Sequence, residues 1–188
     1  MKKLNLLFLA GISLLQLFVP LQTIWTRENV LKHGTVHKFR IAPVDPMDPF
    51  RGSYLALDIQ QSRITMSDTS QFIRKQKIYA VLGKDEEGFA KIINLTPYKP
   101  SSGQDYLKTQ IRYIYNKQIT LDLPFQRYYL NEKATPEAEN YYFNQVRSTT
   151  SNSYITVRIL GGLAALEELY LDGKPLPEIL NTKKSSNS

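Results

Sequence analysis

Residues 43–58 of the chain read PVDPMDPFRGSYLALD, and this stretch decides how the rest of the chain is organised. Its three prolines fix the backbone φ angle and remove three N–H donors, which excludes a helix or a central strand over the run. Tyr54 to Ile59 is then a short apolar segment bounded by turn residues, as is typical of a buried strand. The stretch therefore predicts a stiff turn that delivers the chain into a β-sheet.

Length and composition are those of one globular domain with an attached segment. The chain has 188 residues, of which 22% are charged and 42% are hydrophobic. The absence of cysteine excludes a disulfide framework, thiolate metal sites and cysteine nucleophiles. The net charge is +7, but the basic residues are scattered and form no dense basic helix. We therefore predict a solvated surface and no nucleic-acid partner.

The N-terminal segment from Leu4 to Trp25 contains no charged residue. A helix needs roughly 20 residues to cross the hydrocarbon core of a bilayer, so residues 4–25 predict a single transmembrane helix in contact with lipid. A cleaved signal peptide is the competing interpretation, but Val19-Pro20-Leu21 is too bulky for a cleavage site. Uncleaved, the segment is a signal anchor.

The orientation of this anchor is predicted from the three residues that precede it, Met1-Lys2-Lys3. Lys2 and Lys3 precede the apolar run, while Arg27 and Lys32 follow it, so positive charge alone does not choose a side. A three-residue basic head resembles the start of a signal sequence, which leaves the large domain to be translocated. We expect a single-pass cell-envelope protein of the bacterial membrane, with the bulk of the chain on the extracytoplasmic, periplasmic side.

Alternation of apolar and polar residues predicts antiparallel hairpins through most of the remaining chain. Leu107 to Tyr115 is the clearest case, since its odd-numbered residues share one face and Asn116-Lys117 then turns the chain back. The other expected strands are 36–44, 78–82, 89–95, 154–160 and 163–171, the last two joined by Gly161-Gly162. We predict a mainly β (β-rich α+β) fold: an antiparallel hairpin meander or partly closed barrel behind the N-terminal helix.

Domain limits follow from these patterns. Residues 1–25 are the expected membrane anchor, residues 26–180 the β-rich domain and residues 181–188 a polar, disordered tail. A helix is expected to begin at Thr135, which can cap the free backbone donors, with Pro136 at the first helical position.

The stretch quoted above resembles the signature of the GDYXXLXY family of uncharacterised membrane-anchored bacterial proteins. That signature is Gly-Asp-Tyr-x-x-Leu-x-Tyr, preceded by Pro-Val-Asp-Pro and an arginine. Ser53 replaces the motif aspartate and Ile59 the final tyrosine, so a catalytic role for that aspartate is excluded in this chain. The matching residues are Pro43, Val44, Asp45, Pro46, Asp48, Arg51, Gly52, Tyr54 and Leu57. The similarity continues through 125–139 and the Asp172-Gly173 turn, and it implies a membrane-anchored class without an assigned activity.

The candidate interaction residues lie in the turn and in a later acidic segment. Asp45, Asp48 and Asp58 could offer carboxylates to a cation, but aspartate beside proline is ordinary turn chemistry. Arg51 could recognise a carboxylate or phosphate, or it could pair with an acidic side chain and brace the turn. The expected docking surfaces are this turn and the face that contains Glu132 and Glu139. The motif residues Gly52, Tyr54 and Leu57 complete the candidate site.

Enzymatic interpretations find little support in the sequence. A membrane-anchored Ser-Lys protease similar to signal peptidases would need a serine before the strand at Tyr54, and residues 27–51 contain none. His33 and His37 have helical zinc spacing, but Gly34 lies between them in a strand-like pattern. We therefore predict no metal, no cofactor and a non-enzymatic accessory or interaction domain for a membrane partner, plausibly a multi-pass protein. The alternatives are a small-ligand or cation-binding domain and a degenerate signal-peptidase-like hydrolase.

Overall fold

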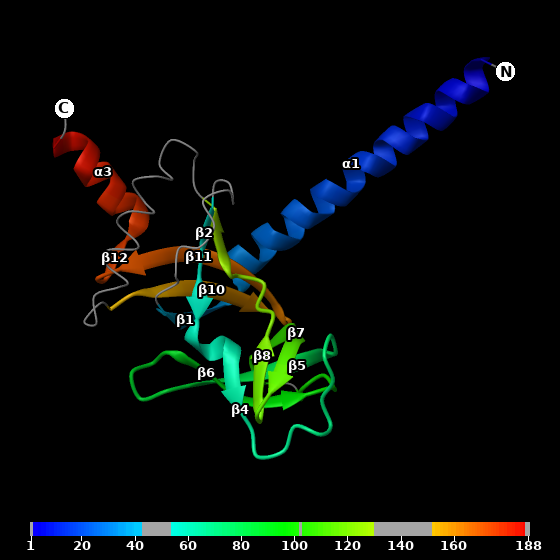
Figure 1. Cartoon of the computed structure of the whole chain (residues 1–188). Helices are drawn as coiled ribbons and strands as arrows, with labels where there is room; N and C mark the ends of the chain where they lie inside the picture. Colours follow the sequence, from blue (N-terminus) through cyan, green and yellow to red (C-terminus); the bar gives the residue numbers. More distant parts are fainter. Residues whose placement is uncertain (1, 43–53, 102, 130–151, 187–188) are drawn as a thin grey trace.

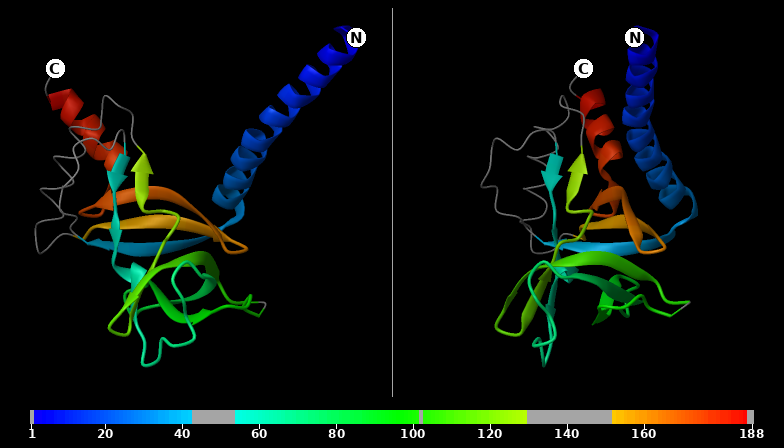
Figure 2. Two further views of the ribbon diagram at one scale, coloured as in Figure 1. Left: turned by 45° about the vertical axis from the view of Figure 1, so that its right-hand side comes forward. Right: turned by 90° about the vertical axis from the view of Figure 1, so that its right-hand side faces the viewer.

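A long N-terminal helix leads directly into the β domain (Figure 1). The computed structural model describes residues 2–42, 54–101, 103–129 and 152–186. Helix α1 spans Lys2–His33, and Gly34 links it to strand β1, Thr35–Ala42. Helix α3, Leu176–Ser186, closes the described chain and projects from the strands on the same side as α1 (Figure 2).

The described strands form two five-stranded sheets and one two-stranded ribbon, and every pair among them is antiparallel. The first sheet has the order β12-β11-β10-β1-β3, with β3 at Asp58–Ile59, β10 at Tyr154–Leu160, β11 at Leu163–Leu171 and β12 at Lys174–Pro175. The second has the order β4-β8-β7-β5-β6, with β4 at Arg63–Thr65, β5 at Lys77–Lys84, β6 at Ala90–Thr96, β7 at Tyr106–Tyr115 and β8 at Gln118–Leu121. The ribbon pairs β2, Tyr54–Ala56, with β9, Arg127–Tyr129.

The two large sheets close around one apolar core. The backbone N–H of Lys108 in β7 donates to the carbonyl of Gly162 in the β10–β11 turn at 2.9 Å, which links this turn of the first sheet to the second sheet. Phe39, Ile155, Leu107 and Leu121, which come from both sheets, are completely buried between them. Figure 2 shows the sheets as two stacked layers. The predicted β-rich, partly closed barrel is confirmed.

Local turn chemistry accounts for three of the hairpins. Asn116 and Lys117 both have positive φ angles, of 46° and 63°, and they connect β7 to β8. The pairs Gly161-Gly162 and Asp172-Gly173 have positive φ angles in the same way. Two central residues with positive φ give a turn whose twist matches the twist of the flanking strands. These three hairpins are therefore specified by the residues of their own turns.

The segment from Tyr54 to Thr65 passes through all three sheets. It pairs with β9 as β2, with β1 as β3 and, after the 3-10 turn η1 at Gln60–Ser62, with β8 as β4. Leu55, Leu57 and Ile59 are buried, whereas the residues between them are half-buried. The apolar run is thus two short strands with alternating burial, because the chain changes pairing partner at Leu57.

Two sequence expectations need correction. Tyr113 and Tyr115 do not share the buried face of Leu107 and Ile111, and they are 46% and 71% exposed. A register shift between Ile111 and Tyr113 adds one residue to β7, which reverses the alternation beyond it.

The second correction concerns the C-terminal segment. Residues 181–186 continue helix α3, where a disordered tail was expected. The buried side chains of Leu176, Ile179 and Leu180 hold the first turns of this helix against the core. The helix expected from Thr135 lies outside the described residues.

Helix α1 is continuous through the predicted boundary between anchor and domain. Across the part of the chain that the structure describes, no helix combines the length and the apolar character needed to cross a bilayer.

Candidate functional site

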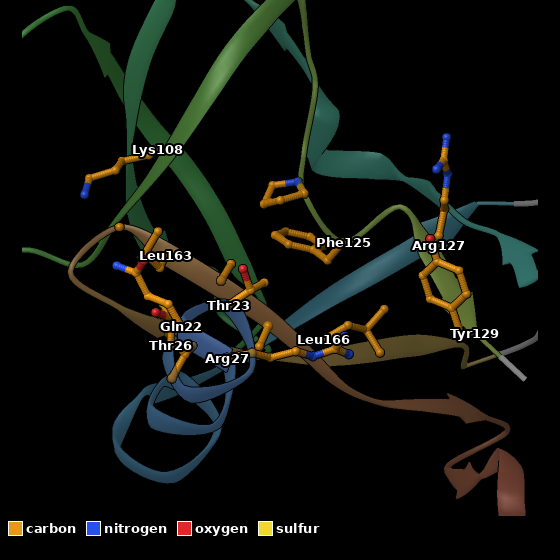
Figure 3. Close-up of a pocket in the computed structure, with 15 residues that line it drawn as sticks. Gln22, Thr23, Thr26, Arg27, Lys108, Phe125, Arg127, Tyr129, Leu163 and Leu166 are labelled. Atoms are coloured by element: carbon orange, nitrogen blue, oxygen red, sulfur yellow. The ribbon is translucent and has the colours of Figure 1, made fainter. Parts of the chain in front are cut away.

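A groove of about 460 Å³ lies where α1 meets the β domain (Figure 3). One wall is the last third of α1, and the others are β7, the segment that leads into β9 and the start of β11. The lining residues are Gln22, Thr23, Thr26, Arg27, Val30, Lys108, Pro124, Phe125, Arg127, Tyr129, Gly162, Leu163, Ala164, Ala165 and Leu166. The groove thus combines segments that are far apart in the sequence.

The helical wall is fixed at its base by Gly34. The N–H of Gly34 donates to the carbonyl of Val30 at 2.8 Å, and Val30 is 3% exposed. A Cβ atom on Gly34 would lie 2.5 Å from the Val30 oxygen and 2.9 Å from the Ile159 nitrogen. The residue must therefore be glycine for the helix end to approach β10 this closely. As a result, α1 holds a defined position against the sheet.

The floor of the groove is apolar and belongs to the core. Phe125 is 2% exposed, and its ring centroid lies 4.9 Å from that of Phe39 in β1. Pro124 and Leu166 extend the apolar surface on either side. A ligand with an apolar part can therefore rest on a surface that is packed against the core.

The ionisable side chains around this floor are three cations and a tyrosine. Figure 3 shows Lys108 and Arg127 at opposite ends of the groove, with Arg27 between them. Among the ion pairs formed by described residues, none includes these three cations. The lining contributed by the described residues contains no Asp or Glu. The groove is consequently suited to a negatively charged group.

The motif residue Tyr54 supports one end of the groove. Tyr54 pairs with Tyr129 across β2 and β9, and their ring centroids are 5.7 Å apart. The guanidinium of Arg127 lies 5.1 Å from the centre of the Tyr54 ring, an arrangement that favours the cation. A hydrogen bond to Tyr129 raises the pKa of Arg127 further. This part of the signature therefore positions a basic side chain.

The other predicted site residues have different outcomes. Leu57 is 4% exposed and packs in the core, so its role is structural. Asp45, Asp48, Arg51, Gly52, Glu132 and Glu139 lie outside the described residues, and their proposed roles stay predictions.

A partly buried hydrogen bond fixes β9 against the first sheet. The hydroxyl of Tyr128 donates to Oε1 of Glu168 in β11 at 2.6 Å, and the N–H of Leu169 donates to the same oxygen at 2.8 Å. Burial and the neighbouring carboxylate raise the pKa of the Tyr128 phenol, so it remains a donor at neutral pH. Because Tyr128 lies between Arg127 and Tyr129, this hydrogen bond fixes the position of β9, from which these two residues line the groove.

A second polar contact joins buried His37 in β1 to Asp105, whose side chain is 44% exposed. His37 is 4% exposed, and its Nε2 lies 3.1 Å from Oδ2 of Asp105. Burial lowers the pKa of His37 from its ordinary value of 6.5. The charge of Asp105 and its hydrogen bond to His37 partly offset this shift, whereas the charge of Lys84 adds to it. The sequence interpretation missed this pair, because Asp105 lies in a loop far from β1.

This pKa shift predicts a loss of stability in mild acid. Below about pH 6.5 the unfolded chain protonates His37 while the folded chain resists protonation, so the free energy of unfolding falls as the pH falls. Urea unfolding of the detergent-solubilised chain between pH 7.5 and 5.5 should show the fall, and His37→Gln should reduce it. His33→Gln, at the exposed end of α1, is the control. Equal pH dependence in His37→Gln and wild type would contradict the assignment.

The described residues hold no metal cluster, and the described groove lining holds no acid-base pair. Within them, no three His, Asp or Glu side chains come close enough to hold a metal ion. The groove lining offers cations, hydroxyls and an amide, but no carboxylate or imidazole base. Binding of an anion is the chemistry that this arrangement supports.

The fold and groove together define a small antiparallel β protein behind a long N-terminal helix, with a basic, apolar-floored groove at the helix base. The sequence model of the GDYXXLXY protein family matches residues 16–169, which is most of the chain, and the chain belongs to this family. The resemblance drawn from the 43–58 stretch is thereby confirmed, and the match includes every residue of the groove. Comparisons with curated proteins and with solved structures find no match.

Proposed function

We propose that the chain is a membrane-anchored envelope protein whose β domain, on the extracytoplasmic side, is a non-enzymatic interaction domain for a membrane partner. The observation that carries this proposal concerns α1, which projects beyond the domain (Figures 1 and 2) and exposes apolar side chains there. Leu17, Phe18 and Val19 are 61%, 61% and 59% exposed. Consecutive helical residues point about 100° apart, so apolar side chains face outward on all sides. Such a surface needs a bilayer or the helices of a partner to cover it.

The sequence of the segment supports insertion into a bilayer. Residues 4–25 carry no charge, Lys2 and Lys3 stand at one end, and Trp25 and Arg27 stand at the other. Tryptophan and basic residues are typical of the two interfaces of a bilayer. The side chains of residues 1–11 and of residues 14 and 15 lie outside the described part of the chain, so for these residues the support comes from the sequence alone.

A binding role is favoured over catalysis by the chemistry of the groove. Its cations come from α1, β7 and β9, and its lining brings no nucleophile together with a base. Tyr54 of the family signature contacts Arg127 at its edge. We therefore place the interaction surface on the side of the domain where α1 enters, close to the membrane and to any multi-pass partner.

Two lysines introduced near the middle of the apolar segment test the anchor. Ile12→Lys/Leu17→Lys should release the chain from membranes on alkaline carbonate extraction, because charged groups in the bilayer core are costly. The wild-type chain should remain in the membrane pellet. The matched control is Ser101→Lys/Gln104→Lys, which adds the same charge in an exposed loop and should also remain. Extraction of the wild-type chain to the same extent as the Ile12/Leu17 variant would refute the anchor.

A separate experiment tests the side of the membrane. A reporter that is active only in the periplasm, fused after Ser188, should be active, and a cytoplasmic reporter at the same place should be silent. The reverse pattern would place the domain in the cytoplasm and overturn the proposed topology.

A further inference from the structure

The groove beside α1 has the two features of a site for a charged amphiphile. Its floor is an apolar surface around Phe125, which is 2% exposed and packed in the core. Its rim carries Arg27, Lys108 and Arg127, and none of these cations forms an ion pair with another described residue. A ligand that matches both features has an anionic group joined to an apolar chain.

The volume and shape of the groove fit part of a small molecule. Its volume is about 460 Å³, and ligand sites commonly enclose about 300–1,000 Å³. Figure 3 shows that the cations are spaced along the groove rather than gathered at one point. A compact free anion would contact one of them, whereas an extended ligand can contact several.

The groove begins on α1 where the exposed apolar run ends. Ile24 and Trp25 are 60% and 71% exposed, and Thr23, Thr26 and Arg27 on the same turns line the groove. If α1 enters the bilayer as proposed above, these residues lie at the depth of the lipid head groups. Basic residues beside a membrane attract anionic lipids, with about 1 kcal/mol for each Lys or Arg.

We infer that the groove binds an anionic phospholipid of the surrounding bilayer. Arg27 contacts the phosphate, Lys108 contacts another part of the polar head group, and part of an acyl chain lies over Phe125 and Leu166. Tyr54 holds Arg127 at the far end of the groove, which connects the family signature to lipid recognition. This inference rests on the proposed function, because the groove lies at the membrane surface only if α1 is inserted in the bilayer.

Native mass spectrometry of the full chain in an uncharged detergent can test this site with phosphatidylglycerol and phosphatidylcholine as probes. We expect one phosphatidylglycerol to be retained in preference to phosphatidylcholine. Arg27→Gln/Lys108→Gln should bind phosphatidylglycerol roughly 10- to 30-fold more weakly. The matched control, Arg74→Gln/Lys99→Gln, removes the same charge from exposed positions outside the groove and should bind as the wild-type chain does.

Several outcomes would overturn the inference. Equal retention of the two lipids, or equal phosphatidylglycerol binding by the two double variants, would remove the groove as a lipid site. Displacement of the lipid by soluble glycerol phosphate at equal concentration would show that the acyl chain plays no part. Preferential binding of a glutamate-rich peptide, with no lipid retained, would assign the groove to a protein partner.

The lipid site and the membrane anchor can fail separately. A chain that resists carbonate extraction but retains the two lipids equally would contradict the lipid site and leave the anchor intact. A chain that is extracted by carbonate yet binds phosphatidylglycerol through Arg27 and Lys108 would support the site and contradict the anchor.

Discussion

Phe125→Ala should lower the free energy of unfolding by about 3–5 kcal/mol. The Phe125 ring is 2% exposed, lies 4.9 Å from the ring of Phe39 and forms the floor of the groove beside α1. Its removal leaves a cavity between two sheets that are joined through several strands, so the walls cannot collapse freely. Urea unfolding of the detergent-solubilised chain, followed by circular dichroism, measures the loss.

Two further variants separate the cavity from the loss of an aromatic ring. Phe125→Leu keeps most of the volume and should lose less than half as much stability as Phe125→Ala. Tyr98→Ala removes an aromatic ring that is 79% exposed, and it should change stability by no more than about 0.5 kcal/mol. A loss below about 1 kcal/mol for Phe125→Ala would mean that this part of the core is not packed as described.

Gly34→Ala should have the second large effect, a loss of about 1–3 kcal/mol or more, because the added methyl group has no space. The new Cβ atom would lie 2.5 Å from the carbonyl oxygen of Val30 and 2.9 Å from the backbone nitrogen of Ile159. Both are backbone atoms, and moving either one separates α1 from β10. Thermal unfolding should occur at a lower temperature, and the Arg27/Lys108 groove should bind phosphatidylglycerol less tightly.

Gly83→Ala provides the comparison for this substitution. The added Cβ atom at Gly83 would meet the side chain of Ile93 at 2.9 Å, and Ile93 is 59% exposed and free to move outward. We expect a small effect on unfolding and none on lipid binding. If Gly34→Ala were as mild as Gly83→Ala, the close approach of helix and strand would not be needed for the fold.

The parts of the fold that depend on neighbouring residues could be predicted from sequence. Two-residue turns such as Asn116-Lys117 and Gly161-Gly162 favour hairpins by their own backbone conformation, and alternating burial marks the strands on either side. The β-rich class and the family followed from such local signals. The extra residue in β7 near Arg112 did not, because a bulge leaves no clear mark in an alternating pattern.

The groove could not be predicted in the same way. Arg27, Lys108 and Arg127 are separated by long stretches of chain, and each one taken alone is an ordinary surface cation. Their common location depends on the pairing of β1 with β10 and of β2 with β9, which no local pattern reveals. Tyr54 was identified as a motif residue, but its contact with Arg127 becomes visible only when those strands are paired.

The pairing of β1 with β10 also bears on the order in which the protein can fold. Residues 35–40 are among the first of the domain to be synthesised, and their partners at 154–159 are among the last. Contacts between residues so far apart form slowly, since a long loop must close before they contribute. The hairpins β5–β6 and β7–β8 can form early, but the first sheet cannot form until β10 and β11 have been synthesised. We therefore expect the barrel to be completed only after residues 154–171 have been synthesised.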